Sequence, residues 1–154
     1  MERFEGKLDG KGMKFAIVCS RFNNFISKNL IDGAVDCLVR HNVDQKDIKI
    51  YIAPGAFEIP QVAKMVIKTN KDLNGIICLG TLIRGETPHF DYIASEVSKG
   101  IAKLNLDVDI PISFGIITAD STDQAIERAG TKSGNKGYDA AETVLELANL
   151  YKRI

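Results

Sequence analysis

The chain has 154 residues, and its 20 lysine and arginine residues balance 20 aspartate and glutamate residues. This length suits one domain, so we expect a single domain over residues 1–154. Because the charges cancel, no global field draws the protein to nucleic acid or to a membrane. The sequence shows neither a signal-peptide pattern nor an apolar run long enough to cross a bilayer. We therefore expect a cytoplasmic protein with no nucleic-acid partner and no membrane partner.

Short apolar segments alternate with segments in which apolar residues recur at helical spacing. The predicted strands are residues 14–19, 48–53, 75–80 and 111–118. The predicted helices are residues 25–41, 58–69, 90–104 and 139–151, with a short helix after the capping pattern Ser121–Gln124. Strands that are apolar on both faces and alternate with helices indicate a parallel sheet covered on both sides. The predicted fold class is α/β, a three-layer αβα sandwich of flavodoxin-like type with a four-stranded parallel sheet.

The polar segment of residues 2–8 precedes this alternating pattern. It is too short to pair stably by itself. We interpret it as an edge strand that is added to the sheet of a neighbouring subunit.

Some residues that attract attention have a structural explanation. His41 and Asn42 follow a predicted helix, where a cation suits the helix dipole and asparagine can adopt the left-handed cap conformation. Cys19, Cys37 and Cys78 are widely spaced in apolar segments and lack metal-ligand spacing. We interpret them as buried free thiols and predict no metal site.

The loops after the strands are the natural place for a ligand, because open parallel sheets bind ligands at their carboxyl edge. None of these loops carries a GxGxxG or GxxxxGK[ST] motif, which argues against dinucleotides and triphosphates. Phe22 and Phe57 lie on two of them, with Asn23 and Glu58 alongside, a combination that suits a flat heterocycle. Alternatively, each phenylalanine caps the core, and Glu58 stabilises the start of a helix.

The loop GTLIRGETPHFDYI, residues 80–93, contains one of only two histidines in the chain. Gly85, Glu86 and Thr87 lead into a predicted helix whose first position suits Pro88, and backbone amides at a helix start form an anion site. His89 is next to this site and can carry protons near neutral pH. A lone loop histidine is, however, more often simply solvated.

Further candidates follow in the last third of the chain. Arg128, Lys132 and Lys136 offer a second contact to an anion, although their spacing alone favours solvated surface charge. Phe114 lies in the middle of a predicted strand, where a side chain is ordinarily part of the core. We expect neither Phe114 nor Arg128 to reach a site in its own subunit easily.

Five segments resemble the lumazine synthase family in both order and spacing. They are RFN (21–23), PGAFEIP (54–60), LGTLIRGETPHFDY (79–92), FGIIT (114–118) and QAIERAGTKSGNKG (124–137). The resemblance implies 6,7-dimethyl-8-ribityllumazine synthase activity, the penultimate step of riboflavin synthesis. In that reaction, 5-amino-6-(D-ribitylamino)uracil condenses with 3,4-dihydroxy-2-butanone 4-phosphate, and no metal or organic cofactor is needed.

The resemblance also implies a role for each matching residue. Phe22 stacks on the pyrimidine, and the ribityl chain is held by Ala56, Phe57 and Glu58. The ring pocket is lined by Thr81, Leu82 and Ile83, and the phosphate is held by Gly85, Glu86 and Thr87. His89 matches the proton-transfer residue of the family. Phe114 and the phosphate-binding Arg128 are supplied by the neighbouring subunit of a pentamer.

Members of the family occur as pentamers, decamers or hollow icosahedral shells. The compact turn GTKSGNKG (130–137) favours the shell, an icosahedral 60-mer with riboflavin synthase as its candidate guest. Pro88 departs from the threonine that is frequent in relatives. The phosphate contacts are therefore expected to come from the three residues before it, Gly85, Glu86 and Thr87. A second hypothesis is a lumazine- or flavin-binding protein that keeps the aromatic pocket without turnover. His89 together with Arg128 favours the enzyme.

Overall fold

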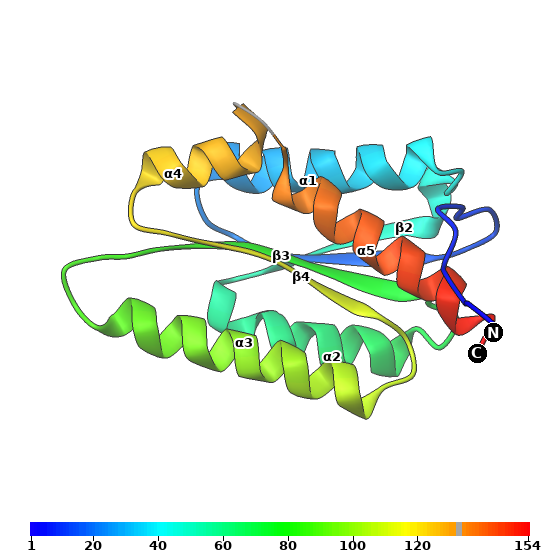
Figure 1. Ribbon diagram of the computed structural model, residues 1–154. Coiled ribbons are helices and arrows are strands. Elements are labelled where there is room, and N and C mark those ends of the chain that lie inside the picture. Colours follow the sequence, from blue (N-terminus) through cyan, green and yellow to red (C-terminus); the bar gives the residue numbers. More distant parts are fainter. Residues whose placement is uncertain (132–133) are drawn as a thin grey trace.

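Four parallel strands form a single sheet in the order β2-β1-β3-β4 (Figure 1). The computed structural model describes residues 1–131 and 134–154. The strands are β1 (Phe15–Ser20), β2 (Ile48–Ala53), β3 (Gly75–Ile83) and β4 (Ile112–Ala119). The α-helices are α1 (Asn24–Arg40), α2 (Ile59–Thr69), α3 (His89–Asp107), α4 (Thr122–Ile126) and α5 (Lys136–Tyr151). Short helical turns are η1 (Gln45–Asp47), η2 (Ala56–Glu58) and η3 (Glu127–Thr131).

The sheet separates two hydrophobic clusters, and this confirms the predicted three-layer α/β sandwich. Helices α1, α4 and α5 cover one face, and α2 and α3 cover the other (Figure 1). Every residue of β1 is buried, because this central strand is covered on both sides. Apolar side chains therefore alternate between the two clusters, as Ile17 in the first and Val18 in the second illustrate.

Strand β3 is longer than its sequence pattern predicted, which ended it at Gly80. It continues to Ile83 because β4 offers partners as far as Ala119, with Ile83 in register with Ala119. Thr81 and Leu82 are consequently strand residues rather than loop residues. Helix α3 begins one residue earlier than predicted, at His89, and Pro88 occupies the N-cap position instead of the first helical position.

The first 13 residues form no strand within this chain and pack instead across the ends of α1 and α5. Arg153 donates a hydrogen bond from Nη1 to the carbonyl oxygen of Glu5 at 2.7 Å. Asn149 donates from Nδ2 to the carbonyl oxygen of Asp9 at 2.9 Å. The predicted pairing of residues 2–8 needs a second subunit and stays a prediction.

The structural explanations proposed for the helix end and for the thiols are confirmed. Asn42 adopts a φ of 73°, and His41 caps α1. The three cysteines are buried, and burial raises the pKa of Cys19 to about 11 and that of Cys78 to about 12. Among the described residues, no helix is long and apolar enough to span a bilayer.

Candidate functional site

The loops that carry the candidate residues meet at the carboxyl edge of the sheet. Ser20 at the end of β1 is in register with Ala53 at the end of β2, and the backbone N–H of Arg21 donates to the Ala53 carbonyl at 2.7 Å. At the far side, Ile83 ends β3 opposite Ala119. Parallel pairing thus delivers the four loops to one edge, where ligands of such sheets bind.

Two aromatic side chains are exposed at this edge, so the interpretation that they cap the core is wrong for this chain. Phe22 is 44% exposed and Phe57 is 56% exposed. Phe22 directly precedes the N-cap of α1, Asn23, whose Oδ1 accepts hydrogen bonds from two backbone amides of the first turn. Because that oxygen is occupied, Asn23 acts as a helix cap rather than as a free polar group beside the aromatic ring.

The loop after β2 turns through η2, which carries Ala56, Phe57 and Glu58. Ala56 is buried against the core, and η2 contacts β1, β3 and α3. Glu58 makes no side-chain cap hydrogen bond, and it lines a hollow of about 390 Å³ together with Tyr51 and Pro54. A β-carbon on Gly55 would lie 3.0 Å from Glu58 Oε2, so the glycine leaves room for this carboxylate. Glu58 is also at the start of α2, where a carboxylate suits the helix dipole.

The last residues of β3 do not all present their side chains to the same side. Ile83 packs against the cluster under α1 and α5, whereas Leu82 packs against the cluster under α2 and α3. Thr81 shares the side of Ile83 by strand alternation, and its buried Oγ1 has no hydrogen-bond partner among the described residues. The side chains of Thr81 and Ile83 therefore lie on one face of the sheet, and that of Leu82 lies on the other.

The loop between β3 and α3 is open to a ligand. Gly85, Glu86, Thr87 and His89 are all exposed. Among the hydrogen bonds of the described residues, none is donated by the backbone amides of residues 85–87. His89 is the first residue of α3 and is separated from this run of free amides by Pro88 alone. Free backbone N–H groups next to a helix start can bind an anion, with His89 alongside to exchange a proton.

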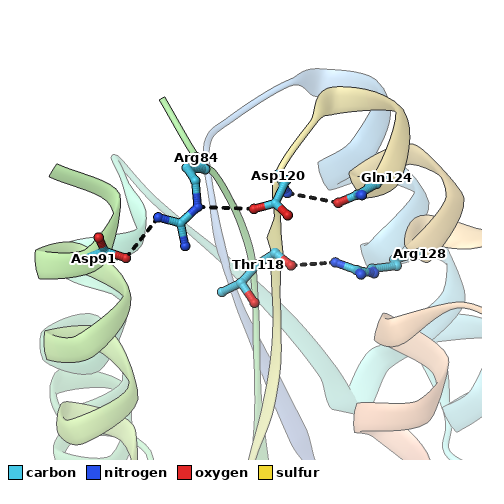
Figure 2. Close-up of polar contacts among 6 residues, drawn as sticks. All are labelled: Arg84, Asp91, Thr118, Asp120, Gln124 and Arg128. Atoms are coloured by element: carbon cyan, nitrogen blue, oxygen red, sulfur yellow. Dashed lines mark hydrogen bonds and ion pairs between the residues drawn. The ribbon is translucent and has the colours of Figure 1, made fainter. Parts of the chain in front are cut away.

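On the edge strand β4, Phe114 is 48% exposed, so the expectation that it belongs to the core is wrong. It shares a face with Ile112 and Ile116, which pack under α2 and α3. Because β4 pairs only with β3, part of this strand is left uncovered. Arg128 is exposed on η3, and its Nη1 donates to the carbonyl oxygen of Thr118 at 2.5 Å (Figure 2).

A model of the family described as 6,7-dimethyl-8-ribityllumazine synthase matches residues 12–152. The chain belongs to this family. The predicted recognition is confirmed, because the match covers nearly the whole sequence. The protein is therefore a transferase of riboflavin biosynthesis with lumazine synthase activity, and the family acts on small molecules and assembles into oligomers.

In this lumazine synthase family member, the structure brings together only some of the predicted site residues. The side chains or backbone at the carboxyl edge come from Phe22, Phe57, Glu58, residues 85–87 and His89. Phe114 lies five residues before the end of its own strand β4, about 16 Å along that strand. Lys136 is exposed at the start of α5, and Lys132 lies outside the described residues. Within the described part of the chain, no group of three or more His, Cys, Asp or Glu residues could hold a metal ion.

Sequence reasoning missed a polar network beside the anion loop (Figure 2). Arg84 pairs with Asp91 and with Asp120, and Gln124 accepts a hydrogen bond at Oε1 from the Asp120 backbone N–H at 2.9 Å. Asp120 is 36 positions from Arg84, so no local pattern could have indicated the contact. Gln124 was predicted only as part of a helix cap, and its backbone N–H does donate to Ser121 Oγ at 3.2 Å.

Proposed function

We propose that the chain condenses 5-amino-6-(D-ribitylamino)uracil with 3,4-dihydroxy-2-butanone 4-phosphate, the penultimate step of riboflavin synthesis. The products are 6,7-dimethyl-8-ribityllumazine, phosphate and water. The observation that carries the proposal is the juxtaposition of His89 with the free backbone amides of residues 85–87, in a chain of the lumazine synthase family. This reaction needs both an anion site for a departing phosphate and a group that exchanges protons.

The pyrimidine substrate is assigned to the loops after β1 and β2. Phe22 and Phe57 present exposed rings, and a flat heterocycle gains by stacking on such a face. Ala56 and Glu58 are assigned to the ribityl chain. The Glu58 carboxylate makes no helix-cap hydrogen bond, so it is free to accept hydrogen bonds from the ribityl hydroxyl groups. Residues 81–83 contribute the floor of the ring pocket.

The phosphate is assigned to Gly85, Glu86 and Thr87, because their amides are free and precede a helix of 19 residues. Pro88 has no N–H to add, so the anion rests on the amides before it. The second phosphate contact is Arg128 of an adjacent subunit. Its guanidinium is exposed and, among the described residues, makes one hydrogen bond to a carbonyl, which leaves its other N–H groups for a phosphate oxygen.

His89 is assigned to proton transfer. The amine of the pyrimidine attacks the ketone carbon, the proton leaves the nitrogen, and water departs to give the imine. A carbon-bound proton is then removed as the C–O bond to phosphate breaks, which leaves an enol. The enol takes up a proton at carbon to give a methyl ketone, and the second amine attacks this ketone and loses a second water to close the ring. An imidazole next to the phosphate can take and return these protons near neutral pH. No cofactor enters this scheme.

The assembly is assigned as a pentamer whose active sites lie between subunits, and as an icosahedral 60-mer of such pentamers. Exposed Phe114 and Arg128 support the first part, because both lie on surfaces that their own chain leaves uncovered. The proposal of a shell is based on the shortness of the stretch between η3 and α5. Riboflavin synthase is the proposed guest inside the shell. The cytoplasm is the proposed location.

The decisive test is to incubate the purified protein with both substrates and record the fluorescent lumazine against the spontaneous reaction. The expected result is formation well above the protein-free rate. Equal rates with and without protein would refute the proposal. The exposed rings of Phe22 and Phe57 also fit a lumazine-binding protein without turnover, so tight lumazine binding without condensation would favour that second function.

A further inference from the structure

Arg84 is the first residue after β3, and its backbone is tied to the neighbouring strand. Its N–H donates to the carbonyl oxygen of Ala119 at 2.9 Å, which extends the pairing of β3 and β4 by one residue. The loop that carries the free amides begins at the next residue, Gly85. The start of this loop is therefore fixed by sheet hydrogen bonding.

The Arg84 side chain reaches across to the other end of the same loop (Figure 2). Its Nη1 lies 3.3 Å from Asp91 Oδ1, in the first turn of α3. Its guanidinium carbon lies 4.6 Å from the centre of the Phe90 ring, a cation–π distance. A third contact, from Nε to Asp120 Oδ1 at 3.1 Å, anchors the guanidinium to the loop after β4.

These contacts close the loop of residues 85–88 at both ends. Phe90 and Asp91 directly follow His89 in the first turn of α3, so a group that holds them also limits how His89 can move relative to β3. The ion pairs are too exposed to matter much for folding. The Arg84 side chain is 49% exposed and its partners 60% and 74%, and such pairs contribute little to stability.

We propose that Arg84 is a positioning residue, which holds the first turn of α3 so that His89 and the amides of residues 85–87 face the same ligand. This role rests on the proposed function. It predicts an unusual combination: removal of Arg84 affects turnover much more than stability. A displacement of about 1 Å at a catalytic group can cost on the order of a hundredfold in rate.

The first measurement is steady-state kinetics of Arg84→Ala, Arg84→Lys and a control. We expect Arg84→Ala to lower kcat about tenfold, with the KM for the pyrimidine substrate within about twofold of wild type. Arg84→Lys keeps the charge but cannot contact two carboxylates in a plane, so it should recover only part of the loss. Arg40→Ala is the matched control, since Arg40 makes an exposed ion pair with Asp36 at 2.9 Å on α1, and its kcat should stay at the wild-type value.

The second measurement does not depend on activity. Hydrogen–deuterium exchange read by mass spectrometry should show faster exchange in peptides covering residues 84–92 of Arg84→Ala, and unchanged exchange there in Arg40→Ala. The melting temperature of Arg84→Ala should fall by less than about 4 °C, because exposed ion pairs contribute little to stability.

Any of three results for Arg84→Ala would overturn the positioning role. They are unchanged exchange over residues 84–92, a kcat within twofold of wild type, and a decrease in melting temperature well above about 4 °C, which would make Arg84 a structural residue. If wild-type protein forms no lumazine above the spontaneous rate, the proposed function fails instead. The exchange experiment then still decides whether Arg84 restrains the loop. Asp120→Asn adds an internal check, since its effect on kcat should be less than additive with that of Arg84→Ala.

Discussion

Asn135, the N-cap of α5, makes four hydrogen bonds with its side chain, and its loss should destabilise the protein more than the loss of an ordinary helix cap. Its Oδ1 accepts from the backbone N–H of Gly137 at 2.8 Å and of Tyr138 at 3.1 Å. Its Nδ2 donates to the carbonyl oxygens of Asn29 and Ala129, both at 2.9 Å. One amide group therefore connects α5 with α1 and η3.

The chain contains a matched control at the start of α1. Asn23 caps that helix by accepting from the amides of Phe25 and Ile26, and its side chain donates no hydrogen bond among the described residues. Asn23→Ala should cost about 1 kcal/mol, the typical value for an N-cap. Asn135→Ala loses a cap and two further hydrogen bonds of about 1 kcal/mol each, so we expect a total of about 3 kcal/mol. Asn135→Asp keeps the acceptor but loses both donated bonds, so its cost should be about 2 kcal/mol.

The assay is thermal unfolding of the variants at one protein concentration, because oligomerisation makes the melting temperature depend on concentration. For a chain of this size, 1 kcal/mol corresponds to roughly 2–4 °C. The expected decreases are about 6–12 °C for Asn135→Ala and about 2–4 °C for Asn23→Ala. Equal decreases for the two alanine variants would refute the reasoning, because the two donated hydrogen bonds would then contribute nothing.

Three further predictions concern the site and the thiols. His89→Ala should lower kcat about a hundredfold without weakening pyrimidine binding, and a loss much below tenfold in the lumazine assay would make His89 a minor participant. Arg128→Ala should raise the KM for the phosphate substrate. Unchanged kinetics would show that Arg128 is only a solvated surface charge. Cys19 and Cys78, with a pKa raised by burial to about 11 and about 12, should resist a thiol reagent at about pH 8 until the protein is unfolded. Because the folded protein favours the neutral thiols, their contribution to the free energy of unfolding is complete below the ordinary thiol pKa of 9.0. This contribution is lost as the pH rises towards the raised pKa values of the folded state, and denaturant unfolding measured at a series of pH values would show the loss.

The periodicity of apolar residues was sufficient to predict the layers of the fold. β1 is buried on both sides, and α1 places Ile26, Leu30 and Ala34 on its buried face. The ends of strands and helices were harder to predict, because they depend on partners far along the chain. β3 runs past Gly80 only because β4 continues beside it to Ala119, and no feature within residues 75–83 records the length of β4.

The residues of the candidate site also fall into those that the sequence could predict and those that it could not. Loop residues such as Phe22, Phe57 and His89 could be predicted, because parallel strands deliver their following loops to one edge. Side-chain networks could not, because Arg84 and Asp120 are brought together only by the folded strands. The exposure of Phe114 was missed for a related reason. Phe114 is exposed although Ile112 and Ile116 on the same face are buried, which is possible because β4 is an edge strand, and strand order is a property of the whole sheet.

The position of Phe114 argues that one ligand cannot contact every site residue within a single chain. Phe57 follows β2 and Phe114 lies on β4, so three inter-strand spacings, about 14 Å, separate them across the sheet. Because Ile52, Cys19, Leu79 and Gly115 are in register, Phe114 also lies two residues, about 7 Å, below the end of β2, which makes the separation roughly 16 Å in total. One pyrimidine ring cannot lie against both residues. A neighbouring subunit that presents its β4 edge to the loops after β1, β2 and β3 removes this difficulty. If Phe114 belongs to the site as proposed, oligomeric assembly is required for a complete site, and subunits separated by dilution should lose activity together with their contacts.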